Sequence, residues 1–167
     1  MTWSPDGPTG TLLGIDLGER RIGLAIADAN GLASRPLATV NRARSLAPAD
    51  DAAILARVVA EQHVTELVVG LPLNANGDRG PMAEATATWA AAISLRLNLP
   101  VALRDERLSS HLAEQRLGPM PRGRGGGPPS KMQRDRYRER VDREAAAIIL
   151  QDELDARHQA RLEAQRA

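Results

Sequence analysis

Three carboxylates stand in or beside apolar segments of this chain. Asp16 lies within the run LLGIDLG (12–18), Glu106 closes the run VALRDE (101–106), and Asp142 precedes the apolar centre of the last amphipathic segment. An ionised carboxylate in apolar surroundings needs hydrogen-bond donors or a cation, because desolvating it alone is unfavourable. If the three side chains meet, their repulsion favours shared divalent cations, and oxygen-only ligation favours Mg²⁺ or Mn²⁺.

Such a carboxylate cluster suits phosphodiester hydrolysis. Two cations roughly 3.5–4 Å apart can activate water and stabilise the leaving oxygen. We therefore expect Asp16, Glu106 and Asp142 to be both catalytic residues and ligands of two Mg²⁺ or Mn²⁺ ions. Ordinary roles stay open at this point: Asp16 could cap a turn, Glu106 could be a solvated strand end, and Asp142 could pair with a neighbouring arginine on its helix.

Basic residues that could hold a phosphate backbone are concentrated late in the chain. The segment 116–140 has eight basic residues against two acidic ones, although the formal net charge of the whole chain is only +1. The glycine- and proline-rich stretch 118–130 would let this segment move over a substrate. A run of charge is more commonly a solvated face, but we expect nucleic-acid contacts from these residues: Arg20, Arg21, Lys131, Arg134 and Arg138.

Apolar periodicity predicts the elements that position these residues. The expected strands cover 12–18, 21–28, 37–40, 66–71 and 101–106, and the expected helices cover 50–63, 81–97, 108–117 and 133–156. Three leading strands followed by alternating helices and strands predict an α/β fold. Its mixed five-stranded sheet has three antiparallel leading strands and then parallel strands, flanked by helices. The period of two turns Asp105 away from Glu106, and helical spacing puts Asp142 on the inward stripe with Ala146 and Ile149.

Composition narrows the class of protein. With 167 residues and 43% hydrophobic content, we expect one domain over 11–156, a flexible N-terminus over 1–10 and a polar tail over 157–167. Cysteine is absent, which excludes disulfides and thiolate metal sites. No apolar run is long enough for a membrane span or a signal peptide, so we expect a cytoplasmic protein without a membrane partner.

Four blocks of the sequence together resemble one known family. GIDLGERRIGLAIAD (14–28), VGLPLNANGDRG (69–80), DERLSS (105–110) and VDREAAAIILQ (141–151) occur in the order found in the YqgF/RuvX family. These ribonuclease H-like proteins are described as Holliday junction resolvases and as nucleases that mature the precursor of 16S ribosomal RNA. The resemblance implies a hydrolase acting on ester bonds, with Asp16, Glu106 and Asp142 as its acids and Arg21 in the arginine position of the first block. The choice of Glu106 over Asp105 rests partly on this resemblance.

Several functions remain open within this interpretation. The resemblance implies processing of the 5′ end of 16S ribosomal RNA precursor in ribosome biogenesis. Junction resolution or DNA cleavage in recombination and repair is the alternative, and junction resolution favours a homodimer that cuts two strands symmetrically. A non-catalytic ribosome-assembly or nucleic-acid-binding factor is a third. The first block is also similar to the phosphate loop of actin-like ATPases and sugar kinases, but a second lobe and a second glycine-rich loop are missing here.

Overall fold

The sheet begins with an antiparallel meander, as the sequence predicts. The computed structural model describes residues 10–166. Strand β1 (Thr11–Leu17) pairs with β2 (Arg21–Asp28), and β2 pairs with β3 (Arg35–Asn41), both in antiparallel fashion. The expected third strand, 37–40, is therefore real but longer at both ends.

The other two strands extend the sheet in parallel on the far side of β1. Helix α1 (Pro48–Glu61) leads to β4 (Val64–Leu71), and α2 (Pro81–Leu97) leads to β5 (Val101–Asp105). Both strands run parallel to β1, which gives the sheet order β3-β2-β1-β4-β5. The mixed five-stranded sheet predicted from the sequence is thus confirmed. Helix α3 (Ser109–Leu117), a 3₁₀ turn (Arg124–Gly126) and α4 (Lys131–Arg166) complete the chain.

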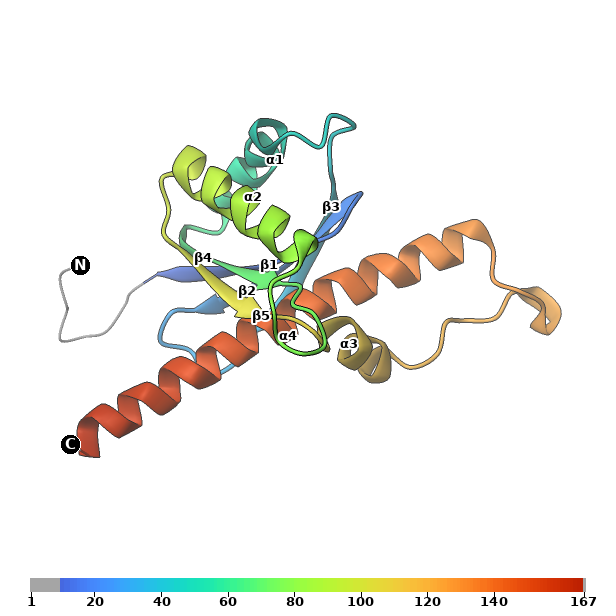
Figure 1. The fold of residues 1–167 in the computed structure, drawn as a ribbon. Helices are drawn as coiled ribbons and strands as arrows, with labels where there is room; N and C mark the ends of the chain where they lie inside the picture. The colour runs from blue at the N-terminus through green and yellow to red at the C-terminus, as the bar shows by residue number, and fades with distance from the viewer. Residues whose placement is uncertain (1–9, 167) are drawn as a thin grey trace.

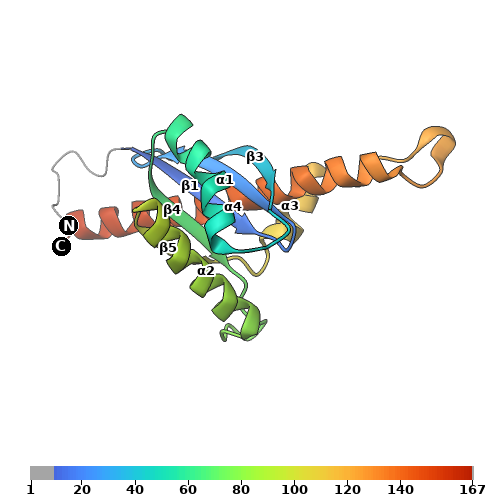
Figure 2. The same cartoon turned by 90° about the horizontal axis from the view of Figure 1, so that it is seen from above.

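The helices form two layers around the sheet (Figure 1). Helices α1 and α2 cover one face, where Leu13, Ile15 and Leu24 join the larger core cluster. Helix α4 crosses the opposite face, where Leu12, Val68 and Ile149 belong to a second cluster. Seen from above, α4 also runs well beyond one edge of the sheet, with the 118–130 loop at its far end (Figure 2). Alternation along β1 therefore assigns the even-numbered residues, Asp16 among them, to the α4 face.

Two glycines allow α4 to lie against the hairpin. A Cβ atom at Gly14 would be 2.9 Å from the Ala146 carbonyl oxygen, and one at Gly23 would be 2.0 Å from the Asp142 carbonyl oxygen. Any larger residue would therefore push the helix backbone away from β1 and β2. These contacts bring Asp142 directly over the strand that pairs with β1.

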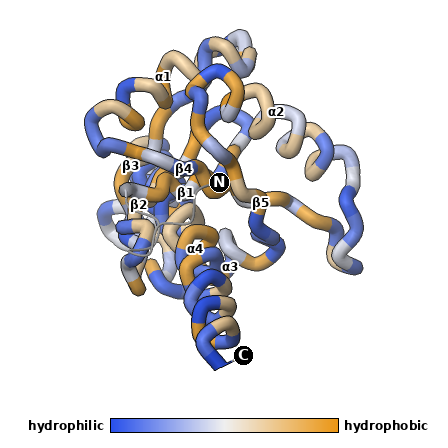
Figure 3. The backbone as a smooth tube through the Cα atoms, turned by 90° about the vertical axis from the view of Figure 1, so that its left-hand side faces the viewer, coloured by the Kyte–Doolittle hydropathy of each residue, from blue (hydrophilic) through white to orange (hydrophobic). Residues whose placement is uncertain are grey.

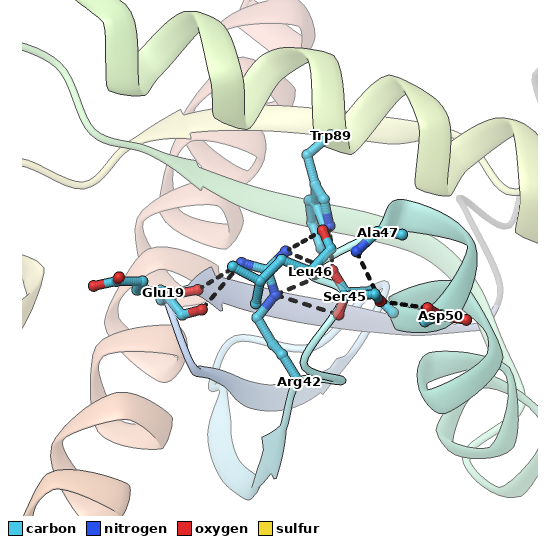
Figure 4. A network of polar contacts seen from close by, with 9 residues as sticks. Glu19, Arg42, Ser45, Leu46, Ala47, Asp50 and Trp89 are labelled. Carbon is cyan, nitrogen blue, oxygen red and sulfur yellow. Dashed lines mark hydrogen bonds and ion pairs between the residues drawn. The ribbon is translucent and has the colours of Figure 1, made fainter.

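A buried polar network joins the opposite helical layer to the β1–β2 turn (Figure 4). The fully buried Asp51 accepts hydrogen bonds from Arg42 Nη2 at 2.7 Å and from Trp89 Nε1 at 2.8 Å. Arg42 also donates to the Gly18 carbonyl at 3.0 Å and to the Leu46 carbonyl at 3.1 Å. Because Gly18 follows β1 closely, this network fixes the turn next to Asp16.

Helix α4 is longer than the sequence predicts at both ends. It begins at Lys131 rather than at 133, because Ser130 and Gln133 cap it reciprocally: each backbone N–H bonds to the other's side chain, at 2.8 and 3.2 Å. The expectation that the helix ends near Ala156 is wrong. It continues to Arg166, and Arg157 bonds to Glu66 of β4, with one contact at 3.0 Å.

The final turns of α4 are strongly hydrophilic, as expected of a polar end (Figure 3). Apart from Gly10, the predicted flexible N-terminus, 1–10, lies outside the described residues. Within residues 10–166, no helix has the length and hydropathy that crossing a bilayer would require.

Candidate active site

The parallel strands bring two of the predicted acids to the same end of the sheet, where β1 and β5 finish. Asp16 lies near the end of β1, and Glu106 directly follows β5. Asp16 is opposite Gly23 of β2, and Ile15 is opposite Val69 of β4, so Gly70 is next to Asp16 on the other side. The carboxylate of Asp16 is therefore flanked by glycines on both neighbouring strands. This leaves space around it on the α4 face.

Glu106 occupies the space beside Gly70. Its Oε2 atom would be 2.2 Å from a Cβ atom at Gly70, and Ile149 Cδ1 of α4 would be 2.5 Å from the same position. Among the described residues, Oε2 is the buried side-chain oxygen without a hydrogen-bond partner. A buried carboxylate oxygen without a donor is a position that a cation or a proton can satisfy.

The raised pKa values of the two acids lead us to expect one shared proton between them at neutral pH. Burial most of all, together with the charge of Asp16 and the hydrogen bond with Asp16, raises the pKa of Glu106 to about 9. Burial also raises the pKa of Asp16 to about 6, with a smaller upward contribution from Asp142, although the hydrogen bond with Glu106 opposes it. At neutral pH the Glu106 carboxyl is thus protonated and donates to an ionised Asp16. Binding of a divalent cation at the site would release that proton.

Asp142 lies beside this pair, but its carboxylate is turned to Arg21. Arg21 Nε donates to Asp142 Oδ2 at 2.7 Å, so the partner of Asp142 is on β2 and not on its own helix. Asp142 is near enough for its charge to act on Asp16. Within residues 10–166, no three acidic or histidine side chains are yet grouped closely enough to hold a metal ion. The structure joins Asp16 to Glu106 and joins Asp142 to Arg21.

Asp105 bonds to Arg107 and not to the acidic pair, although its charge adds to the raised pKa of Glu106. Its side chain bonds to Arg107, with Arg107 Nη2 at 2.8 Å from Asp105 Oδ2. Burial opposes ionisation of Asp105, but the hydrogen bonds and the charge of Arg107 outweigh it and lower its pKa. The same arginine donates to the Ala75 carbonyl at 3.1 Å and so holds the β4–α2 loop against the start of α3.

Three residues that shape the site were not singled out by the sequence analysis. Gly70 provides the space for Glu106, Arg107 fixes the neighbouring loop, and the buried Ser109 donates from Oγ to the Glu106 carbonyl at 3.0 Å. In the sequence they were marked only by the block DERLSS and by the glycine that follows the β-branched residues of β4. Neither feature indicates a carboxylate neighbour unless the strand order is known.

The predicted basic residues divide into two groups. Arg21 belongs to the site through Asp142. Arg20 is exposed in the β1–β2 turn, and Lys131, Arg134 and Arg138 are exposed on the first turns of α4, which project beyond the sheet (Figure 1). Their spacing puts the three α4 residues on one helical stripe that reaches Asp142 one turn later.

The residues present fit divalent cations by their chemistry. The donor set is made only of carboxylate oxygens, Glu106 Oε2 lacks a partner, and both acids of the pair have raised pKa values. Hard cations such as Mg²⁺ and Mn²⁺ prefer this type of ligand.

Strand order and site together define the class of protein. A sheet of order β3-β2-β1-β4-β5, with one acid near the end of β1, one directly after β5 and one on the helix that covers them, is a ribonuclease H-like arrangement. The chain belongs to the RuvX family, described as Holliday junction resolvase, which matches residues 10–156. It is therefore a member of a family of nucleases, hydrolases that act on ester bonds.

Curated relatives match along most of their length. A protein of Chloroflexus aggregans is 44% identical over 147 residues, which cover 88% of this chain and 94% of that protein. One of Anaeromyxobacter dehalogenans (strain 2CP-C) is 46% identical over 145 residues, covering 87% and 96%. Both carry the name "Putative pre-16S rRNA nuclease". Among solved structures, Thermus thermophilus RuvC in complex with a Holliday junction substrate is similar at a TM-score of 0.45 and 18% identity, over 84% of this chain and 92% of that chain.

Proposed function

We propose that this chain is a metal-dependent nuclease that hydrolyses phosphodiester bonds of structured nucleic acid, with the 5′ end of the 16S ribosomal RNA precursor as its substrate. The observation that carries the proposal is the buried pair of Asp16 and Glu106, with an unpartnered Glu106 oxygen and with Asp142 beside it. An acidic pair that keeps a proton at neutral pH is unfavourable for a purely structural role. The names of the relatives support the RNA substrate, and such a substrate implies action in the cytoplasm.

Each residue of the site then has a definite task. Asp16, Glu106 and Asp142 would hold two Mg²⁺ or Mn²⁺ ions, which when bound supply an activated water and neutralise developing charge. Glu106 has to release its proton and Asp142 has to turn from Arg21 to complete the ligand set. Arg21 keeps Asp142 near the pair and has further N–H groups for a phosphate oxygen. Lys131, Arg134 and Arg138 would bind the phosphate backbone away from the reaction centre.

The test compares substrates and metals on the purified full chain. The substrates are precursor RNA carrying the 16S 5′ end, single-stranded RNA, duplex DNA and a four-way DNA junction, each with Mg²⁺, Mn²⁺ or a chelator. We expect cleavage of the precursor that is lost on chelation and reduced at least about a hundredfold in Asp16→Asn and Asp142→Asn, because metal-assisted hydrolysis contributes several kcal/mol. Asp50→Asn, on the opposite helical layer, should keep wild-type activity.

The other outcomes separate the alternatives. Preferential cleavage of the four-way junction by a dimer would replace the RNA substrate with junction resolution. Binding of RNA with no metal-dependent cleavage of any substrate would overturn the enzymatic proposal and identify a binding factor.

A further inference from the structure

A cavity of about 660 Å³ opens directly beside the acidic pair. It lies between the β4–α2 loop, the start of α3 and the middle of α4, and Glu106 forms part of its wall. The cavity therefore shares a residue with the reaction centre but extends away from Asp16. A substrate whose phosphate lies at the acids would have an adjacent group at this opening.

The walls of the cavity are mainly apolar. Leu73, Leu108, Leu112 and Ile148 line it. Leu108 and Leu112 are 65% and 41% exposed, which is high for large apolar side chains next to a cavity. Such a lining favours a flat, uncharged group rather than the sugar–phosphate backbone.

The cavity also has polar groups in its lining, both acidic and basic. Asp105 and Asp152 complete its lining, together with Arg107 and Ser109. Arg107 is already bonded to Asp105 and to the Ala75 carbonyl, and Ser109 to the Glu106 carbonyl. In the described part of the chain, the Asp152 carboxylate belongs to none of the ion pairs. With Arg107 engaged, the unpaired Asp152 carboxylate is an acceptor in the cavity that is open to the N–H donors of a ligand.

We propose that this cavity holds one unpaired nucleobase of the substrate, next to the phosphodiester that is cut. The apolar side chains would contact the faces of the base, and Asp152 would accept hydrogen bonds from its edge. Guanine is the favoured base, because its adjacent N1–H and N2–H donors match the two oxygens of a carboxylate. Uracil has a single N–H donor on that edge and carbonyl oxygens that the acids would repel.

This inference rests on the proposed nuclease function and specifies its substrate. It implies cleavage next to a bulged or looped-out nucleotide, since a base held in a helical stack cannot enter a cavity without being unpaired. A fully paired duplex would meet the acids without occupying the cavity.

Binding is measured first, without relying on cleavage. The probes are three fluorescein-labelled RNA duplexes that are identical except for a single bulged guanine, a single bulged uracil or no bulge, and fluorescence anisotropy gives each Kd with the full chain in chelator. We expect the bulged guanine to bind about tenfold more tightly than the bulged uracil or the paired duplex. Asp152→Asn should remove the guanine preference, and Leu112→Arg should bring both bulged duplexes to the affinity of the paired one.

One control variant and three outcomes decide the matter. Asp155→Asn removes the same charge one turn further along α4, outside the cavity, and should keep the preference. Equal affinities of the wild type for all three duplexes, or a guanine preference that survives Asp152→Asn, would overturn the inference. If the preference is found but neither these duplexes nor the precursor RNA are cut when Mg²⁺ or Mn²⁺ is added, base binding in the cavity stands and the nuclease proposal fails.

Discussion

At the scale of single residues, the acidic pair that we propose for catalysis lowers the stability of the folded protein at higher pH. The pKa of Glu106 is raised from 4.5 to about 9 in the folded protein, mainly by burial. Between these two values the folded protein binds one more proton than the unfolded chain. The free energy of unfolding therefore falls as pH rises through this window.

Glu106→Gln should accordingly stabilise the metal-free protein, and more so at higher pH. Glutamine keeps the shape of the side chain and never ionises, so the difference in Tm between variant and wild type should be small at pH 5 and clearly positive at pH 8.5. Thermal unfolding in chelator measures it. Adding Mn²⁺ should raise the Tm of the wild type more than that of the variant, because the variant has lost a ligand.

Asp105→Asn is the matched control on the adjacent residue. The pKa of Asp105 is lowered by Arg107, so its ionised form contributes stability above the unfolded-state pKa, which is lost as pH falls. The control should therefore show no gain at pH 8.5. A pH-independent effect of Glu106→Gln would contradict the shared proton.

Part of the residue-scale geometry could be predicted from the sequence. The period of two on β5 separated Glu106 from Asp105, and helical spacing directed Asp142 inward; both follow from local geometry. The ion pair of Arg21 with Asp142 could not be predicted, because the two residues are 121 positions apart and meet only after α4 has crossed β2. The role of Gly70 depends in the same way on which strand pairs with β1 and β5.

At the scale of elements, the position of α4 depends on glycines of the hairpin. A Cβ atom at Gly23 would be 2.0 Å from the Asp142 carbonyl oxygen, which is backbone and cannot move without the helix. Gly23→Ala should thus displace α4 and lower the free energy of unfolding by about 3 kcal/mol, the upper range for overpacking. Denaturant unfolding measures the change. Gly127→Ala, where the nearest atom is 3.8 Å away, should leave stability unchanged.

The same variant links packing to activity. Because Asp142 belongs to the backbone segment that Gly23 supports, Gly23→Ala should also reduce metal-dependent cleavage under conditions where the protein remains folded. Wild-type stability in Gly23→Ala would mean that the close approach of helix and strand can relax without loss.

The order of the elements was predictable, whereas their ends were less so. Short apolar runs separated by turn residues identify all five strands, and Pro81 marks the start of α2 as predicted. The start of α4 was missed by two residues because the reciprocal cap of Ser130 and Gln133 was not recognised in the sequence S-x-x-Q. Its end was missed because the polar final turns contain no apolar stripe, and Arg157 is held by Glu66 of a strand distant in sequence.

At the scale of the whole molecule, charge is localised instead of spread over the surface. The net charge is only +1, so long-range attraction of nucleic acid has to come from a local concentration of arginine. The first turns of α4 supply it, because they project well past the sheet (Figure 2). The protein thus has an acidic site and, beside it, a basic segment at residues 131–140, which we call the basic arm.

The two sides of this arm give a matched test of how it binds. Arg134 and Arg138 share a helical stripe with Asp142, while Arg136 and Arg140 lie on the opposite side, and all four side chains are exposed. If the stripe contacts the phosphate backbone, Arg134→Gln/Arg138→Gln should weaken RNA binding and lower the slope of log K against log salt by about 1.5 to 2. Arg136→Gln/Arg140→Gln removes the same charge and should change the slope by less than about 0.5, since it loses only distant attraction. Fluorescence anisotropy between low and moderate salt measures both slopes in an Asp16→Asn background that does not cut the probe. Equal slopes for the two double variants would mean that the arm acts only as a diffuse positive field, and the path of the backbone from the arm to the acids would have to be sought elsewhere on the sheet edge.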